Sequence, residues 1–368
     1  MTLLVLTFRS LLAAIGFFAI KIERSDATAS FWTLFTEIFI KAGDSPHYLH
    51  IAKYGYAATG EYANRIVFYP LYPLLIRLTQ MIIGNYFIAG LLVSLLCLIL
   101  ASCYIYRLLQ NEFDDLTALR GALLLQLYPF SVFLGGVYTE SLFILLTSMV
   151  FFYLQQRAWK TVALVALLAG LTRTQGVVLL LPIVYEYCLA QHLFQSSSLI
   201  WKRLNKDAFA IACIPMGYGC YLLINKIVQD DWFAFVAHLK APPWWQGADW
   251  VGNNIAQHFA MSEQHLSLGI YIYWPQIVGF FTSLALLAWA LRKGLRTSWI
   301  IYGLASLTLS YTASWLISGP RYLLGNLSLF LLLSAFVQNE LKRLLVYSFF
   351  SFLLVFYTIS FWQGQAIM

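Results

Sequence analysis

The sequence predicts an all-α, polytopic integral membrane protein with about 11 transmembrane helices. Apolar residues make up 61% of the 368 residues and charged residues only 11%, whereas a soluble domain has roughly 45–50% and 25%. The apolar residues also gather in long runs, and the mean hydropathy is +0.73. A soluble fold of this length cannot bury so much apolar surface, but a bilayer can solvate it.

A spanning helix needs about 20 predominantly apolar residues. The candidate spans are Thr2–Ile20, Tyr86–Tyr106, Gly121–Gly135, Ser141–Gln155, Thr161–Leu171, Gly176–Leu189, Ala208–Val228, Gly269–Leu291, Ser298–Ile317, Tyr322–Gln338 and Leu344–Phe361. Several are short, and such helices are expected to pack around a cavity. Residues 161–189 could instead form one long tilted helix. The first span is interpreted as retained, with a cleaved signal peptide as the alternative.

The basic residues indicate the orientation, because cytoplasmic loops carry an excess of Lys and Arg. With a cytoplasmic N-terminus, the inner loops hold Arg107, Arg120, Arg157, Lys160, Lys202, Arg203, Lys206, Arg292, Lys293, Arg296, Lys342 and Arg343. Two long segments, 21–85 and 229–268, then lie on the outer side of the membrane. We expect residues 1–368 to form a single domain.

The net charge is +7, but the basic residues are scattered between apolar runs. This distribution argues against a nucleic-acid partner. The chain has five cysteines, an odd number, and no CxxC spacing. The cysteines therefore indicate neither a disulfide framework nor a zinc site.

The first long loop is expected to contain interfacial helices. Phe31–Ile40 has an amphipathic pattern, with polar residues against a face of Phe and Ile. Phe68–Ile83 contains Pro70 and Pro73 near its start and continues in a helical pattern that Arg77 interrupts. Loops this long in a compact protein are usually functional.

Four charged residues at the ends of predicted spans are candidate functional residues, each with a structural alternative. Asp44 is followed by Ser-Pro-His and is either a catalytic carboxylate or a helix N-cap. Glu140 opens a span, where the helix dipole alone would favour it. Arg173 interrupts a long apolar run, either as a functional charge or in a simple turn. Arg321 follows a Gly-Pro turn, and the alternative is an arginine that snorkels to the interface.

The predicted topology brings these four residues to the same outer face, although they come from separate parts of the chain. An arginine binds a phosphate bidentately, and a carboxylate accepts the proton of a hydroxyl. Together they suit a reaction between a hydroxyl and a phosphate-linked donor, so the sequence favours a transferase. It does not identify the group that is transferred.

Five segments in this order resemble the PIG-V-type mannosyltransferases, relatives of GPI mannosyltransferase 2 in the GT-C superfamily. The segments are Asp44–Tyr56 (DSPHYLHIAKYGY), Phe68–Leu78 (FYPLYPLLIRL), Tyr138–Leu146 (YTESLFILL), Ala169–Pro182 (AGLTRTQGVVLLLP) and Gly319–Leu333 (GPRYLLGNLSLFLLL). The resemblance implies a GT-C fold, an active site on the non-cytoplasmic face and a polyprenyl-phosphate sugar as donor, which is dolichyl-phosphate mannose in eukaryotic members. It implies that Asp44 is the catalytic base. Trp commonly precedes that Asp in the family, but here Gly43 does, and the GPI acceptor is not carried over.

These expectations combine into an inverting transfer from the lipid donor to a glycan or glycolipid acceptor. Asp44 would deprotonate the acceptor, and Arg173 and Arg321 would neutralise the departing phosphate. His47 would orient Asp44 or bind the phosphate, and Glu140 would hold sugar hydroxyls or a divalent ion. Further substrate contacts are assigned to Tyr48, Tyr69, Gln175, Tyr322 and Trp245.

Several alternatives stay open at this stage. The Trp-rich loop 242–250 would either stack the acceptor sugar or anchor the protein at the interface. The carboxylates and histidines lack a diagnostic metal spacing, so a divalent ion stays possible. A transporter, or an accessory lipid-binding subunit without chemistry, is the alternative to a transferase. The membrane would be the inner or plasma membrane in a bacterium and the endoplasmic reticulum in a eukaryote.

Overall fold

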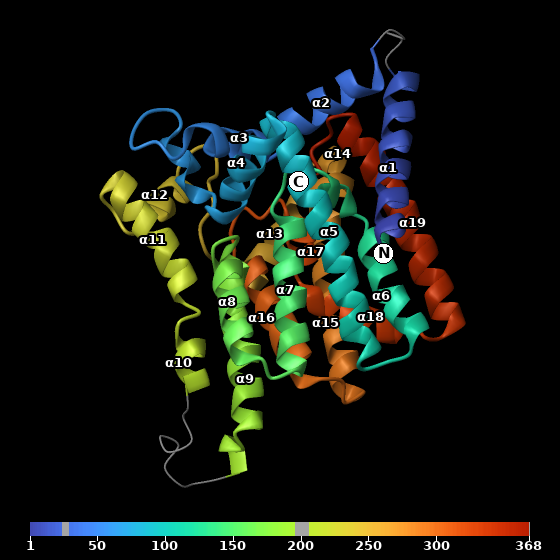
Figure 1. Cartoon of the computed structure of the whole chain (residues 1–368). Helices are drawn as coiled ribbons and strands as arrows, with labels where there is room; N and C mark the ends of the chain where they lie inside the picture. Colours follow the sequence, from blue (N-terminus) through green and yellow to red (C-terminus); the bar gives the residue numbers. More distant parts are fainter. Residues whose placement is uncertain (24–28, 196–205, 368) are drawn as a thin grey trace.

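The computed structural model describes residues 1–23, 29–195 and 206–367, and its long elements are all helices joined by loops and turns (Figure 1). Lys202 and Arg203 of the orientation argument lie outside the described residues. The only β-bridge among these residues is an isolated antiparallel one between Ala248 and Ala313.

The helices up to residue 195 are α1 (Thr2–Glu23), α2 (Phe31–Lys41), α3 (Ser45–Tyr54), η1 (Ala63–Val67), α4 (Leu71–Ile83), α5 (Tyr86–Gln110), α6 (Asp115–Leu127), η2 (Ser131–Gly135), α7 (Glu140–Gln155), α8 (Trp159–Gly170), η3 (Thr174–Leu179), α9 (Leu180–Ala190) and η4 (Leu193–Gln195). The helices after residue 205 are α10 (Lys206–Ala212), α11 (Met216–Gln229), α12 (Ala234–Lys240), α13 (Val251–Gln264), α14 (Leu266–Leu268), the π-helical turn η6 (Gly269–Tyr273), α15 (Trp274–Arg292), α16 (Thr297–Tyr311), α17 (Gly319–Leu324), α18 (Leu327–Phe336) and α19 (Glu340–Trp362).

The protein is an integral, multi-pass membrane protein. Five helical stretches among the described residues are long and apolar enough to span a bilayer: Thr2–Glu23, Tyr86–Gln110, Lys206–Gln229, Leu266–Arg292 and Glu340–Trp362. Most other predicted spans fall on shorter apolar helices, and the chain breaks between α8 and η3 rather than forming one helix over 161–189. The predicted span Tyr322–Gln338 is likewise divided into α17 and α18.

The segment between α1 and α5 forms helices because its sequence supplies caps and turns. The side chain of Ser30 accepts a hydrogen bond from the backbone of Thr33 at the start of α2. Gly84 ends α4 with a φ of 79°, a left-handed conformation that glycine adopts without strain. Asn85 then caps α5 through a hydrogen bond from Ile88. The predicted amphipathic stretch Phe31–Ile40 is confirmed as α2, which lies with α3 and α4 at one end of the bundle (Figure 1).

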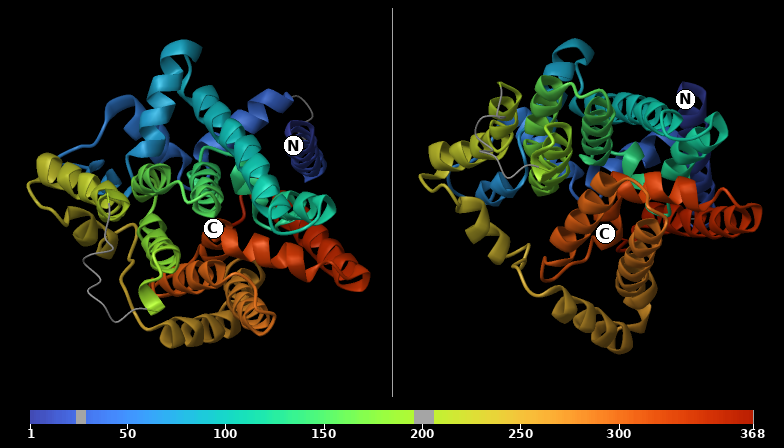
Figure 2. Two further views of the ribbon diagram at one scale, coloured as in Figure 1. Left: turned by 60° about the horizontal axis from the view of Figure 1, so that its bottom comes forward. Right: turned by 90° about the horizontal axis from the view of Figure 1, so that it is seen from below.

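Helix α7 is buried along most of its length, so it lies at the centre of the helical core. In the two views of Figure 2, α11 and α13 lie toward the edge of the molecule, and α7 lies further inside. Arg9 in α1 donates to the backbone oxygen of Ser131 at 2.5 Å and to the side chain of Gln126 at 3.2 Å. The cation inside the first span is therefore bound by the polar end of α6 and the start of η2.

Close helix packing depends on small residues in this fold. A Cβ atom added to Gly217 of α11 would lie 2.1 Å from the backbone oxygen of Leu167 in α8. A backbone atom cannot move away as a flexible side chain can. Gly217 therefore allows the two helices to approach closely, as small residues do at membrane helix interfaces.

We predict that Gly217→Ala destabilises the protein by about 1–3 kcal/mol, because the added methyl group overpacks this contact. The matched control is Gly219→Ala in the same helix, where an added Cβ meets nothing within 4 Å. That substitution should be neutral or slightly stabilising, because alanine favours a helix over glycine. Thermal unfolding in detergent measures both variants, and equal melting temperatures would contradict the packing argument.

Candidate active site

The four charged residues selected from the sequence form one contiguous cluster. Arg321 donates from Nε to Glu140 Oε1 at 2.5 Å and from Nη2 to Asp44 Oδ2. Arg173 donates from Nη1 to the same oxygen of Glu140 at 2.8 Å. Two carboxylates and two guanidiniums, drawn from positions up to 277 residues apart, thus share one buried network of ion pairs.

Asp44 occupies the N-cap position of α3, but its side chain makes no capping hydrogen bond. The capping interpretation is therefore wrong for its carboxylate, which pairs with Arg321 instead. The preceding Gly43 has a φ of 47°, and a Cβ atom there would approach the Tyr138 hydroxyl to 3.0 Å. Tyr138 in turn donates to the backbone oxygen of Ala42 at 2.9 Å. Backbone geometry and close packing together favour glycine at the position where the resembled family commonly has Trp.

Glu140 is the first residue of α7, and its side chain is 0% exposed. Its Oε1 accepts from both guanidiniums, whereas Oε2 is buried without a hydrogen-bond partner among the described residues. The helix dipole favours an acid here, but two adjacent cations make the stronger contribution. Glu140 therefore holds Arg173 and Arg321 side by side.

Arg321 is the third residue of α17, which follows a stretch of irregular backbone after α16. The side chain of Gln276, in α15, donates to Leu316 O at 2.6 Å and accepts from Gly319 N at 3.3 Å. The guanidinium of Arg321 faces the ring of Tyr138 at 4.8 Å. Its side chain is only 4% exposed. A snorkelling arginine would extend toward water, so that alternative is wrong.

Arg173 has an extended backbone at the junction of α8 and η3. The turn is tight because Gly176 packs on the end of α8, where a Cβ atom would lie 2.3 Å from Ala169 O. The guanidinium of Arg173 lies over the ring of Tyr322 at 5.2 Å. The polar residues between the two apolar runs thus form a turn that also delivers a buried charge to the cluster.

A cavity of about 330 Å³ opens beside the cluster. Seven of the ten sequence-predicted site residues line it: Asp44, Tyr48, Tyr69, Arg173, Gln175, Arg321 and Tyr322. Polar residues that the sequence analysis did not single out also line it, namely Thr172, Thr174, Gln246, Ser310 and Thr312. Ser310 and Thr312 lie within the predicted span Ser298–Ile317, and nothing local to that stretch indicates a site. A cavity with two guanidiniums, a carboxylate and several hydroxyls and amides can bind a phosphorylated, hydroxyl-rich ligand.

Three predicted site residues lie outside the cavity lining. Glu140 lies behind the two arginines, so in this structure it contacts them and not the cavity. Trp245 is 60% exposed, whereas its neighbour Trp244 lines the cavity. Trp245 therefore stays a predicted substrate contact outside this cavity, and Trp244 is the tryptophan of the pair that lines it.

His47 packs among aromatic rings rather than against Asp44. Its ring stacks on Phe68 with centroids 4.8 Å apart and meets Trp244 at 5.2 Å. Its Nδ1 is buried without a hydrogen-bond partner among the described residues. Burial lowers the pKa of His47 below its ordinary value, although the charge of Asp44 opposes this. The ring is therefore neutral near pH 7 and does not orient Asp44 through a hydrogen bond.

No group of three or more His, Cys, Asp or Glu side chains in the described part of the chain is arranged to hold a metal ion. Both carboxylates of the cluster accept instead from guanidiniums. A divalent ion at Asp44 or Glu140 stays a prediction from the sequence alone.

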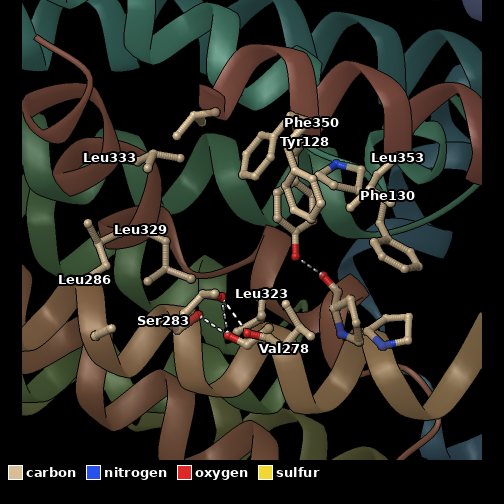
Figure 3. Close-up of a pocket in the computed structure, with 18 of the residues that line it drawn as sticks. Tyr128, Phe130, Val278, Ser283, Leu286, Leu323, Leu329, Leu333, Phe350 and Leu353 are labelled. Atoms are coloured by element: carbon tan, nitrogen blue, oxygen red, sulfur yellow. Dashed lines mark hydrogen bonds between the residues drawn. The ribbon is translucent and has the colours of Figure 1, made fainter. Parts of the chain in front are cut away.

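A second cavity, of about 690 Å³, lies between α15, α18 and α19 (Figure 3). Most of its lining side chains are apolar, among them Phe130, Leu286, Leu329 and Leu353. At one point Tyr128 donates a hydrogen bond to the backbone oxygen of Pro320 at 2.9 Å. Pro320 lines this apolar groove, and the next residue, Arg321, lines the polar cavity. The linings of the two cavities share no residue, but they are adjacent in the sequence at residues 320 and 321.

Residues 69–218 match the family model described as dolichyl-phosphate-mannose-protein mannosyltransferase. The matched part includes Glu140 and Arg173 but not Asp44 or Arg321. No curated protein is detectably similar in sequence.

A crystal structure of ArnT from Cupriavidus metallidurans, bound to undecaprenyl phosphate, has a similar fold with a TM-score of 0.54. The identity is 14%, and the likeness covers 85% of this chain and 60% of the ArnT chain. The chain thus spans less than two thirds of the length of ArnT. This likeness confirms the predicted all-helical membrane fold. The number of about 11 transmembrane helices stays a prediction. Neither match concerns the PIG-V type specifically.

We predict that Glu140→Ala destabilises the protein by about 3–5 kcal/mol, because it leaves two buried guanidiniums without their shared carboxylate. The matched control is Glu37→Ala, which removes an exposed carboxylate paired with Lys41 one helical turn away. That variant should lose no more than about 0.5 kcal/mol. Thermal unfolding in detergent provides the measurement, and similar melting temperatures for the two variants would argue against a structural role for Glu140.

Proposed function

We propose that this protein is a membrane glycosyltransferase that moves a sugar from a polyprenyl-phosphate donor to an acceptor hydroxyl. One observation carries the proposal: a carboxylate and two guanidiniums line one cavity beside an apolar groove. A lipid-linked sugar combines three chemical parts, which are a long hydrocarbon chain, a phosphate and a sugar. The groove, the arginines and the polar cavity offer one suitable environment for each part.

Arg173 and Arg321 are the groups that would bind the donor phosphate. Guanidiniums form bidentate, charge-assisted hydrogen bonds to phosphate oxygens. Charge develops on the phosphate as the bond to the sugar breaks, and preorganised cations in a site of low dielectric stabilise that charge. The bound undecaprenyl phosphate of the similar ArnT structure supports this class of donor.

The hydrocarbon chain of the donor would lie in the apolar groove. The groove reaches from Leu345 to Tyr357 along α19, a distance of about 18 Å at 1.5 Å per residue. This length accommodates several isoprene units. A chain in the groove would bring its phosphate toward Arg321, since Pro320 borders the groove at the residue before it.

Asp44 would act as the general base in a single displacement. The acceptor oxygen attacks the anomeric carbon, and Asp44 accepts the hydroxyl proton as the new carbon–oxygen bond forms. The bond from that carbon to the phosphate oxygen breaks, and polyprenyl phosphate leaves with the electron pair. Attack opposite to the leaving group inverts the anomeric configuration. Tyr48, Tyr69 and Gln175 would contact the sugar.

The family model matched by residues 69–218 and the PIG-V-type resemblance favour mannose as the sugar. Under the positive-inside orientation, the cavity faces the non-cytoplasmic side. A glycan or glycolipid would supply the acceptor hydroxyl.

We predict that Asp44→Asn reduces transfer about 10²–10⁴-fold, because the amide cannot accept the proton. An assay with polyprenyl-phosphate mannose and a panel of acceptors measures this. The control is Asp230→Asn, whose side chain is 94% exposed and paired with Lys226, and it should retain activity. An Asp44→Asn protein that folds and transfers at the full rate would instead favour an accessory subunit without its own chemistry.

We also predict that Leu286→Trp raises KM about tenfold for a long-chain donor, because the indole fills the groove that the chain would occupy. A donor with only two isoprene units should be much less affected. Leu284→Trp is the control, since Leu284 lies on the same helix, is 40% exposed and does not line the groove. Equal effects on the long and short donors would rule out the groove as the chain-binding site.

A further inference from the structure

Arg321 connects two carboxylates that differ in their access to the cavity. Through Nε it binds Glu140, which is fully buried and does not line the cavity. Through Nη2 it binds Asp44, whose side chain is 22% exposed and does line the cavity. An entering ligand can therefore reach the Asp44 end of Arg321 but not the Glu140 end.

The formal charges of the cluster cancel, because two carboxylates face two guanidiniums. A phosphodiester donor brings one further negative charge into this poorly solvated place. Like charges in a low dielectric repel strongly. The phosphate therefore binds well only if one carboxylate moves away from its arginine.

The two carboxylates differ in how firmly they are held. Glu140 belongs to the buried helix α7 and binds both arginines. Asp44 lies in the turn before α3, follows Gly43 and makes no capping hydrogen bond. Asp44 is thus the carboxylate that can turn away while the rest of the cluster keeps its geometry.

We propose that the donor phosphate and Asp44 compete for Arg321, and that Glu140 is a positioning residue that keeps both guanidiniums in place. This inference rests on the proposed function. Without donor, the pair with Arg321 holds the Asp44 carboxylate away from the acceptor. When a phosphate oxygen replaces Asp44 at Arg321, the carboxylate is released toward the acceptor hydroxyl. The donor therefore binds before the acceptor can be deprotonated.

The test compares binding of undecaprenyl phosphate and uncharged undecaprenol to the full-length protein in detergent. It uses wild type, Asp44→Asn and Asp44→Ala, with Asp230→Asn as a control for the same change in charge. We expect the preference for the phosphate over the alcohol to rise about tenfold in both Asp44 variants, equivalent to about 1.4 kcal/mol. It should stay unchanged in Asp230→Asn. Unchanged binding of undecaprenol verifies that each variant is folded.

If wild type prefers the phosphate and the Asp44 variants show the same or a smaller preference, competition at Arg321 is refuted and the proposed transferase stands. If neither the wild type nor the variants prefer the phosphate, the assignment of a polyprenyl-phosphate donor fails as well.

Discussion

This structure depends on one buried cluster of charges, in which two carboxylates pair with two guanidiniums. Water cannot screen these charges there. Glu140 binds the guanidiniums of Arg173 and Arg321, and Arg321 also forms an ion pair with Asp44. A buried ion has a high desolvation cost, which only a close and well-oriented partner offsets. The elements that carry these residues are therefore fixed relative to one another, although they are distant in the sequence. The same interaction that organises the bundle also creates an electrostatic site beside a cavity.

The backbone near the cluster is irregular, and side chains form hydrogen bonds with its peptide groups. Tyr128 donates to the carbonyl of Pro320, and Gln276 contacts both Leu316 and Gly319. Inside a membrane, irregular backbone is tolerated only where protein or a water-filled cavity satisfies its polar groups. These hydrogen bonds allow α17 to begin in the core, so that Arg321 enters the cluster from within the bundle.

The two cavities have different chemistry, and their linings are adjacent in the sequence at Pro320 and Arg321. The groove between α15, α18 and α19 is mostly apolar, whereas the cavity at Arg173 and Arg321 is lined by charged, hydroxyl and amide groups. An amphipathic ligand with a hydrocarbon chain and an anionic head fits such a pair of neighbouring environments. A purely hydrophilic substrate would leave the groove unexplained. This juxtaposition supports the proposed polyprenyl-phosphate donor.

The sequence by itself determined the membrane character and singled out Asp44, Glu140, Arg173 and Arg321 as one group of charges. Long apolar runs are readable locally, and a charge within or beside them is costly enough to stand out. Tertiary structure alone decided that Glu140 lies behind the arginines, that Trp244 rather than Trp245 lines the cavity, and that His47 packs among aromatic rings. The reason is physical. Composition reports the free energy of transferring a segment into lipid, whereas the direction of a side chain depends on contacts with residues far away in the chain.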